Sequence, residues 1–326
     1  MPPTQELERT GRVRDGRVIA AQPAYPARPQ HPLGAPTLSG TTITVDIMLN
    51  TPTRITRMIM DLSQERFITD RIYASAGGVT GGAVIFDIQD TNQLYTDRDA
   101  EQVSPGASFP IVTSVRLGAG VAPVEKWGAK TFITDEARDR NNAVLFTNQL
   151  RQMTNTLIRK INARGMAVLN AALANYPAQV IAGHNWQTVN LQGSSPTPVA
   201  QTPAADIAKA QQQAETQELG MVYDTLLLNP QEANQVNLIY SVVAGGWDAI
   251  AASWGITETY ASPRIAPGIG YVIASQQAGG MRTEKPLGTE TWREAETERT
   301  WVQASVRPVF YVDNPTAVVE LTGLAG

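Results

Sequence analysis

The sequence predicts an α+β protein whose parts extend beyond one globule. Three observations indicate this class: a helical stripe from Thr134 to Tyr176, two alternating strand patterns within residues 83–118, and further alternation after residue 300. A long helix and paired strands in separate segments are typical of α+β proteins. The chain has 326 residues, which is enough for two or three domains.

Composition narrows the class of protein. The formal net charge is −4 and no cysteine is present, so neither disulfides nor thiolate metal sites can form. No run of like charge suggests a nucleic-acid-binding tail. The N-terminus has no apolar signal core, and the most apolar window, Tyr240 to Ile256, is interrupted by Asp248 and by glycines. We therefore expect a soluble, non-secreted protein that does not enter a membrane.

Residues 1–40 show no helical or strand period and are expected to form an extended N-terminal arm. Its prolines recur every three residues, which is the period of a polyproline II helix: Pro23, Pro26, Pro29 and Pro32. The arm is either a disordered or stiff linker, or a segment that becomes ordered against a neighbouring molecule. In the second case its arginines would meet carboxylates of that neighbour or touch nucleic acid loosely: Arg9, Arg12, Arg14 and Arg17.

Residues 41–82 are predicted to hold a strand and a short helix. Apolar residues at 43, 45, 47 and 49 alternate with other types, which indicates a half-buried strand. Thr51 and Pro52 then suit the N-cap and first position of a helix. Apolar residues at helical spacing extend that helix over 52–68.

Residues 83–118 are predicted to be one extended β-hairpin. Val84, Phe86 and Ile88 share one face of the first strand, and residues 111–117 alternate in the second. About twenty charged and turn-forming residues separate them, which is uncommon for a loop inside a compact domain. A two-stranded hairpin is marginal in water, so we expect it to lie on another subunit.

The central element is a helix predicted from Thr134 to Tyr176. Thr134 suits the N-cap, Asp135 and Glu136 suit the first turn, and Pro177 ends the segment. At 1.5 Å per residue the helix would be roughly 60 Å long, more than one domain spans. A coiled-coil strut is the alternative, but Gly165 interrupts the stripe. We interpret it as a spine with neighbours on several sides, within a segment 119–177.

Residues 178–280 are expected to form a mixed domain of helices and strands. The segment 192–205 reads as a loop, 206–219 as a helix, and 222–228 as a buried strand. Asn229 and Pro230 repeat the cap signature for a helix to Tyr240. A loop at 244–255 and strands near 256–260 and 271–275 follow. The loop carries Trp247 and Trp254, which either pack in the core or contact copies around a symmetry axis.

Residues 281–326 are charged and then strand-like, and are expected to close the fold. Alternation at Val302, Ala304 and Val306 indicates a strand. The charges are either a solvated face or intersubunit pairs that set register: Arg293, Glu294, Glu296, Glu298 and Arg299.

Residues suited to catalysis are few. The chain has two histidines, His31 and His184, which leaves little for a triad or a metal cluster. The sequence lacks the GxSxG, HExxH, EF-hand and phosphate-loop motifs. Asp97 and Asp99 lie in the expected exposed hairpin loop, where nothing would raise a pKa. We expect no enzyme, no metal and no cofactor, although a soluble enzyme or monomeric binding module remains the competing class.

The order of these parts resembles the major capsid proteins of tailed bacteriophages, with the Hong Kong 97-type shell fold. Particular phrases carry the likeness, which covers about residues 41–326: PGASFP at 105–110, KWGAKTFITDEARDRNN at 126–142, NTLIRKI at 155–161, and RPVFYVDNPTAVVELTGL at 307–324. The resemblance implies a Hong Kong 97-like capsid fold with an N-terminal arm (1–40), a strand and short helix of a peripheral domain (41–82) and an extended loop (83–118). It further implies a peripheral domain with the spine helix (119–177), an axial domain (178–280) and a closing peripheral segment (281–326).

The resemblance also implies a function and partners. Copies would form pentamers and hexamers of an icosahedral shell, assembled in the host bacterial cytoplasm around scaffold and expanded as double-stranded DNA is packaged. Partners would be other copies, a portal, a scaffold and a possible decoration protein, with non-specific contacts to DNA on the inner face. The expected intersubunit contacts are Arg12, Arg14, Arg17, Pro26, Pro29, Tyr95, Asp97, Arg98, Asp99, Glu101, Phe109, Arg138, Arg140, Trp247, Trp254, Arg293, Glu294, Glu296, Glu298 and Arg299.

Two further expectations concern shell chemistry. Some relatives lock the shell with a lysine–asparagine isopeptide bond from the extended loop, but no lysine lies within 83–118 here. We therefore expect a shell held together non-covalently, with or without a cement protein. The alternative shell is an encapsulin-type nanocompartment, against which the Pro-rich arm argues because a compartment more often begins with a cargo-binding helix.

Overall fold

The computed structural model describes residues 11–14, 17–20, 45–63, 68–89, 96–113, 118–192, 194–218 and 220–325. Within the arm, which the sequence left without regular structure, β1 (Gly11–Arg14) and β2 (Arg17–Ala20) pair antiparallel. The proline repeat with Pro26 and Pro29 lies outside the described residues. Among those residues no helix is both long and apolar enough to cross a membrane.

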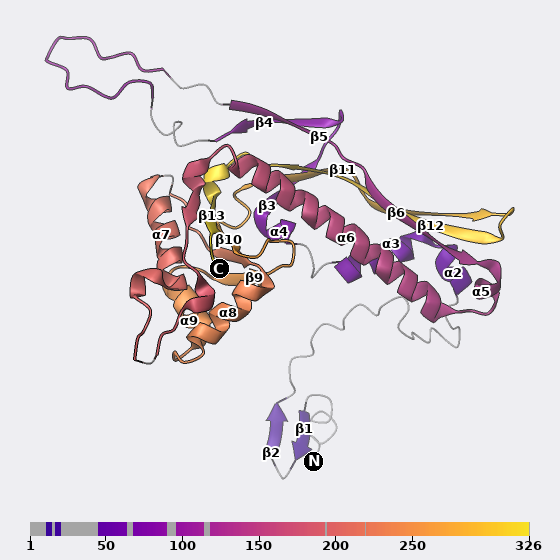
Figure 1. The fold of residues 1–326 in the computed structure, drawn as a ribbon. Helices are drawn as coiled ribbons and strands as arrows, with labels where there is room; N and C mark the ends of the chain where they lie inside the picture. Colours follow the sequence, from indigo (N-terminus) through magenta and orange to yellow (C-terminus); the bar gives the residue numbers. More distant parts are fainter. Residues whose placement is uncertain are drawn as a thin grey trace, which may run out of the picture.

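A five-stranded sheet forms the core of the larger globular part (Figure 1). Its strands, in spatial order, are β7 (Val180–Ala182), β13 (Val318–Thr322), β10 (Ile269–Ile273), β8 (Thr225–Leu228) and β9 (Glu258–Ala261). Strand β10 is antiparallel to both of its neighbours, whereas β7 is parallel to β13 and β9 is parallel to β8. Because β13 comes from the end of the chain, the pairing crosses the expected boundary at residue 280.

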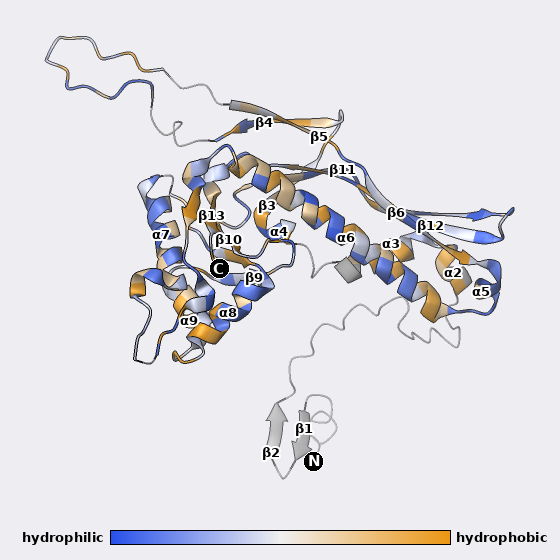
Figure 2. Ribbon diagram, in the orientation of Figure 1, coloured by the Kyte–Doolittle hydropathy of each residue, from blue (hydrophilic) through white to orange (hydrophobic). Residues whose placement is uncertain are grey.

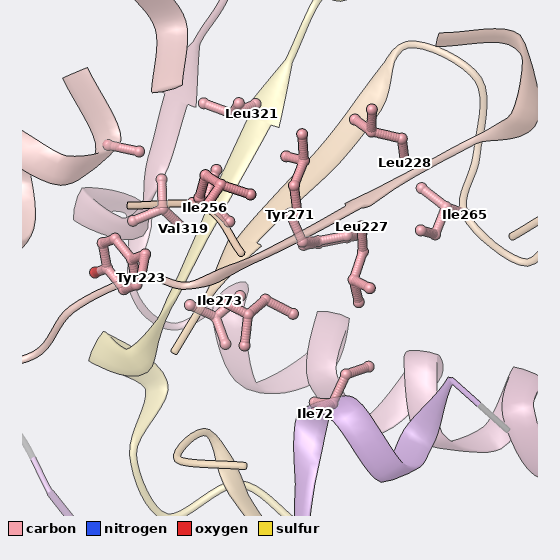
Figure 3. Packing of buried hydrophobic residues seen from close by; sticks show 14 of the residues in the cluster. Ile72, Tyr223, Leu227, Leu228, Ile256, Ile265, Tyr271, Ile273, Val319 and Leu321 are labelled. Atoms are coloured by element: carbon pink, nitrogen blue, oxygen red, sulfur yellow. The ribbon is translucent and has the colours of Figure 1, made fainter. Parts of the chain in front are cut away.

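The core of this part is continuous with the base of the spine helix. Strand β8 is buried along its whole length, and Figure 3 shows Leu227, Tyr271 and Ile273 packed above Ile72. Three helices lie in the same globular part: α7 (Pro203–Thr216), α8 (Pro230–Tyr240) and α9 (Gly246–Ser253). Asn229 caps α8 as predicted, because its Oδ1 accepts a hydrogen bond from Gln231 N at 2.9 Å.

A four-stranded sheet runs beside the long helix, in the order β3 (Tyr73–Gly78), β11 (Gly279–Glu294), β12 (Arg299–Tyr311) and β6 (Trp127–Thr134). Its long hairpin, β11 with β12, projects away from the globular part (Figure 1). The sequence indicated only the second of these two strands.

The remaining helices are α2 (Val45–Leu49), α3 (Pro52–Ser63), α4 (Thr69–Ile72), α5 (Asp135–Asp139) and α6 (Ala143–Leu173). Short 3-10 turns lie at Pro177–Gln179, Trp186–Thr188, Val199–Gln201 and Pro315–Ala317.

The predicted single helix from Thr134 to Tyr176 is wrong in its first turns. Helix α5 ends at Asp139 and α6 begins at Ala143, because Asn141 adopts a positive φ of 49° between them. The side chain of Asn141 accepts a hydrogen bond from Val45 N at 2.9 Å, and that of Asn142 accepts one from Leu145 N at 3.1 Å. Helix α6 keeps the predicted stripe over 31 residues, about 46 Å at 1.5 Å per residue.

Helix α6 continues through Gly165, as the predicted helix requires, and the glycine that interrupts the apolar stripe in sequence occupies a buried position of the helix. It lies buried where α6 crosses α4 and β3, and a Cβ there would meet Thr69 Cγ2 at 2.4 Å. Tyr73 donates a hydrogen bond from its hydroxyl to Gly165 O at 2.7 Å, and burial raises the pKa of that phenol. The glycine therefore allows a close crossing of backbones.

Four other local predictions differ from the structure. Residues 45–49 form helix α2, because Val45, Met48 and Leu49 share one helical face in a cluster with Phe146. The strand that pairs with β4 (Ala83–Ile88) is β5 (Gly118–Pro123); residues 111–113 of the predicted strand are not in a strand, and 114–117 lie outside the described residues. The loop expected at 244–255 contains α9 instead, and the strand expected from residue 222 begins at Thr225.

Candidate assembly surfaces

The 96–113 loop extends away from the rest of the molecule beyond β4 and β5 (Figure 1). Its two sides are joined where Thr113 donates from its backbone N to Asp97 Oδ1 at 2.8 Å and from its hydroxyl to the other carboxylate oxygen. The hydroxyl bond, followed by the backbone bond, lowers the pKa of Asp97. Arg98 pairs with Glu101 at 2.6 Å, and Asp99 is exposed. Tyr95 lies outside the described residues.

The 96–113 loop also presents apolar side chains to solvent. Phe109 is 83% exposed and Ile111 is 85% exposed, and Figure 2 shows apolar colour along the protruding loop. Exposed apolar groups on a protruding segment mark an interaction surface more often than groups scattered over a globule. The sequence predicted Phe109 at such a surface and missed Ile111, which it assigned to a strand.

The β4–β5 ribbon has one packed face and one bare face. Val84 and Ala122 pack on Val309 and Tyr311 of β12, with Phe86 close by on the same side. On the opposite face, the directly paired residues Ile85 and Val121 are 76% and 66% exposed. This apolar pair, which sequence reasoning missed, gives the ribbon a second uncovered surface.

Charged residues at the end of the β11–β12 hairpin are already engaged within the chain. Arg293 donates from Nε to Asp135 Oδ2 at 3.0 Å, and this bond lowers the pKa of Asp135. Glu294 accepts from Thr297 Oγ1 at 2.6 Å and from Trp301 Nε1 at 3.0 Å, which lowers the pKa of its carboxyl. These groups were expected to pair between subunits, and the structure gives them partners in their own chain.

Some of the remaining predicted contact residues also have partners within the chain, and others are exposed. The guanidinium of Arg299 lies 4.4 Å from the Phe132 ring centroid, and Glu298 accepts a backbone hydrogen bond from Asp135 N. Arg138 is 3.6 Å from Asp135 in an ion pair. Arg140 and Glu296 are exposed. Arg12, Arg14 and Arg17 lie in β1 and β2, and only their backbone is described.

The two tryptophans of the 244–255 segment have different roles. Trp247 is 4% exposed, donates from Nε1 to Thr259 Oγ1 at 3.1 Å and packs against Tyr240. It is a core residue and not a contact residue, which is the first of the two expected roles. Trp254 at the end of α9 is 42% exposed and remains available for a contact.

His184 belongs to a structural hydrogen-bond cluster around Asp206. The fully buried Asp206 carboxylate accepts from His184 N at 3.0 Å and from Trp186 Nε1 at 2.9 Å, and its Oδ1 lies 2.8 Å from His184 Nδ1 and 3.3 Å from Lys209 Nζ. Within the described part of the chain no hydroxyl group hydrogen-bonds to the His184 ring, and the cluster holds the 183–188 turn against α7. His31 lies outside the described residues, and among the described ones no group of His, Asp and Glu could hold a metal ion.

The arrangement of protruding loop, long helix and two sheets is that of a shell protein with the Hong Kong 97-like capsid fold. The family model described as phage capsid protein matches residues 118–321, more than half of the chain. The chain therefore belongs to the phage capsid protein family, as the sequence resemblance implied. No curated protein matches the sequence.

Solved structures share the fold at low sequence identity. A protein of Mycobacterium phage Bobi superposes with a TM-score of 0.57 at 13% identity, covering 77% of this chain and 88% of that one. The capsid of Myoviridae phage XM1 gives 0.55 at 13% identity, covering 78% and 90%. A virus-like particle from Pyrococcus furiosus gives 0.53 at 11% identity, covering 82% and 98%.

Proposed function

We propose that this chain is the major head protein of a tailed bacteriophage. Copies assemble into pentamers and hexamers that form an icosahedral shell around packaged double-stranded DNA. The shell matures by expansion and is held together non-covalently. Portal, scaffold and decoration proteins are its proposed partners, and assembly takes place in the host cytoplasm.

The observation that carries this proposal is the surface that one copy leaves uncovered. The 96–113 loop exposes Phe109 and Ile111, and the ribbon below it exposes Ile85 beside Val121. A second copy lying over these apolar groups removes their surface from water. This burial stabilises the contact by about 25 cal/mol per Å² of apolar area. The family match to phage capsid proteins supports the proposal that this second copy belongs to a closed shell.

The domain roles are part of the proposal. Residues 1–40 act as an arm that reaches a neighbour, and 41–82, 119–177 and the hairpin after residue 280 act as a peripheral domain. Residues 83–118, extended to Pro123 by the β4–β5 pairing, act as the loop that lies over the adjacent copy. Residues 178–280 act as an axial domain, where the exposed Trp254 meets other copies around the capsomer axis.

A nanocompartment shell is the second candidate function. Its support is the likeness to the Pyrococcus furiosus virus-like particle, which is nearly as close as the likeness to the phage proteins. The two functions differ in what the shell encloses. Particles that carry a co-purified cargo enzyme and no DNA would favour the compartment.

Electron microscopy of the purified full-length chain tests the shell role directly. We expect closed shells or ring-shaped capsomers, with a matching early peak in size-exclusion chromatography. A single species of about 35 kDa at high concentration, with the loop folded against its own chain, would overturn the proposal. Denaturing gels of the same shells should show monomers only, since no lysine lies within 83–118 to form an isopeptide bond.

A further inference from the structure

The spine helix lies in a long stretch of sequence that contains no acidic residue. Between Asp139 and Asp206 there is no aspartate or glutamate, although the whole chain has 30 of them and a net charge of −4. Every charged side chain of α6 is therefore basic: Arg151, Arg159, Lys160 and Arg164.

The structure turns three of these bases outward. Arg151, Arg159 and Lys160 are exposed, whereas Leu150, Leu157 and other apolar residues of α6 are buried. At about 3.6 residues per turn, Arg159 lies near the middle of the exposed half of the helix, and Arg151 and Lys160 lie at its two edges. The rise of the helix separates residues 151 and 159 by about 12 Å. The exposed side chains that accompany these bases are Gln152, Asn155 and Thr156, so this part of the face carries hydrogen-bond donors and no carboxylate of its own. We call Arg151, Arg159 and Lys160 the basic spine face.

Folding does not account for these three charges. Arg164, one turn beyond Lys160, pairs with Glu125 by a bond from its Nε at 2.9 Å and is half-buried. By contrast, no carboxylate of the described residues lies within 4 Å of the three outward bases, whose side chains make no hydrogen bond within that part of the chain. Three bases without acids also forgo the stabilising i,i+4 ion pairs that an exposed helix usually makes.

A polar recess continues the same face toward the globular part. A cavity of about 740 Å³ is lined by Arg159 and Asn155 of α6 and by Arg264 of the loop after β9. Arg71 also lines it and pairs with Glu258 at 3.1 Å, and Asp70 supplies a carboxyl at one side. The recess thus adds Arg264, which has no ion pair among the described residues, to the positive field of the helix.

We propose that the basic spine face binds the phosphate backbone of double-stranded DNA. The inference rests on the proposed function, which places packaged DNA inside the shell, and it assigns the DNA-facing side to the exposed arc of α6. Duplex DNA carries a negative charge for each roughly 1.7 Å of its axis, so unpaired arginine and lysine side chains spread over the exposed half of α6 can meet its phosphates without sequence preference. The opposite face of the four-stranded sheet is mixed in charge, with Glu290 near Lys285, and is not proposed to face DNA.

The repetition of copies in a shell strengthens this assignment. Each copy would add three unneutralised positive charges to the same surface, and like charges in an array repel one another unless a polyanion covers them. DNA supplies that polyanion in the lumen. The array therefore favours packaging, because each phosphate contact releases a condensed counterion.

The test compares duplex binding by the full-length unassembled chain with that of the R151Q/R159Q/K160Q variant. Fluorescence anisotropy measures the affinity for a labelled duplex across roughly 50 to 200 mM salt. Each phosphate contact contributes about −0.9 to the slope of log affinity against log salt, so the variant should lose up to about 2.7 from the slope. Across that salt range wild-type affinity would then fall about 40-fold more than that of the variant.

The matched control is K126Q/K130Q/K285Q, which removes the same charge from exposed lysines in or next to β6 and β11. Its slope should stay within a few tenths of the wild-type value, and two duplexes of unrelated sequence should bind alike. An equal loss in both variants, or an unchanged slope in the spine variant, would overturn the inference. So would tighter binding of poly-glutamate than of the duplex, because the partner would then be an acidic protein.

Closed shells distinguish this inference from the function on which it depends. Shells of the wild-type chain should not bind externally added duplex, since the face points inward, and the spine variant should still form shells under the electron microscope. If the wild-type chain forms no shells, the proposed function fails. If shells form and bind external duplex with the full salt slope, the shell role stands and the inward assignment of the basic spine face fails.

Discussion

Single residues set close contacts at the spine helix and in the turn that packs against α7. Gly165 sits where a side chain would enter Thr69, and Asn141 holds a positive φ that ends α5. Asp206 is fully buried and is the shared acceptor for a backbone N–H and an indole N–H. In each case the residue type follows from one geometric requirement at one position.

Replacing Gly165 with alanine should destabilise the fold even though alanine favours helices by about 1 kcal/mol. The added Cβ would lie 2.4 Å from Thr69 Cγ2, and the branched threonine cannot move aside easily. Overpacking of this kind costs about 1–3 kcal/mol. Thr69→Ser removes the clashing methyl group, so the double variant G165A/T69S should recover most of the loss in chemical denaturation. Equal losses in the single and double variants would contradict the contact.

The carboxyl of Glu294 provides a pH-dependent stabilisation. Its hydrogen bonds to Thr297 and Trp301 lower its pKa, so the stabilisation is present above the unfolded pKa near 4.3 and is lost as pH falls through the lower folded value. The difference in melting temperature between wild type and Glu294→Gln should be constant from about pH 5 to 8 and shrink below about pH 4. A difference that grew at low pH would contradict the assignment.

At the scale of elements, faces decide which side chains are structural. The same alternation that buries Val84 exposes its neighbour Ile85, and the chain covers only one side of the ribbon. Similarly, the apolar stripe of α6 faces the core while its basic arc faces outward. Each of these two elements therefore has one side packed in the fold and one exposed side, which we propose is used for contacts with partners.

Substitutions on the two faces of β4 should separate stability from assembly. Val84→Ser removes a buried side chain and should weaken docking of the ribbon by about 2 kcal/mol, seen as faster proteolysis of residues 83–123. Ile85→Ser should leave unfolding unchanged and reduce shell formation. If both variants assembled normally with equal stability, the ribbon would have no interface on its bare face.

The whole molecule is shaped for contact with copies of itself. The hairpin of β11 and β12, helix α6 and the 96–113 loop all project from the sheet-centred globular part (Figure 1). Nothing in the described part of the chain covers Phe109 or Ile111. We propose that neighbouring copies in a shell cover each of these places, in keeping with the family match.

Deletion of residues 95–108 should give a folded chain that makes no closed shells. The loop contacts little of its own chain, so circular dichroism and melting temperature should change little. The substitution F109S/I111S, which removes only exposed apolar side chains, should reduce shell yield in the same direction on negative-stain images. Normal shells from the deletion variant would show that the loop is dispensable.

The sequence by itself determined the elements whose pattern reflects burial on one side. The stripe of α6, the Asn229–Pro230 start of α8 and the first ribbon strand were predicted because local periodicity and capping act within a few residues. Only the tertiary structure decided the rest. Residues 45–49 fit both a strand and a helix pattern, and packing against Phe146 selected the helix. The charges of the β11–β12 hairpin found partners in their own chain, because folding brings Arg293 to Asp135 across 158 positions of sequence. Local pattern cannot encode such distant contacts, which depend on how the sheets and the spine meet.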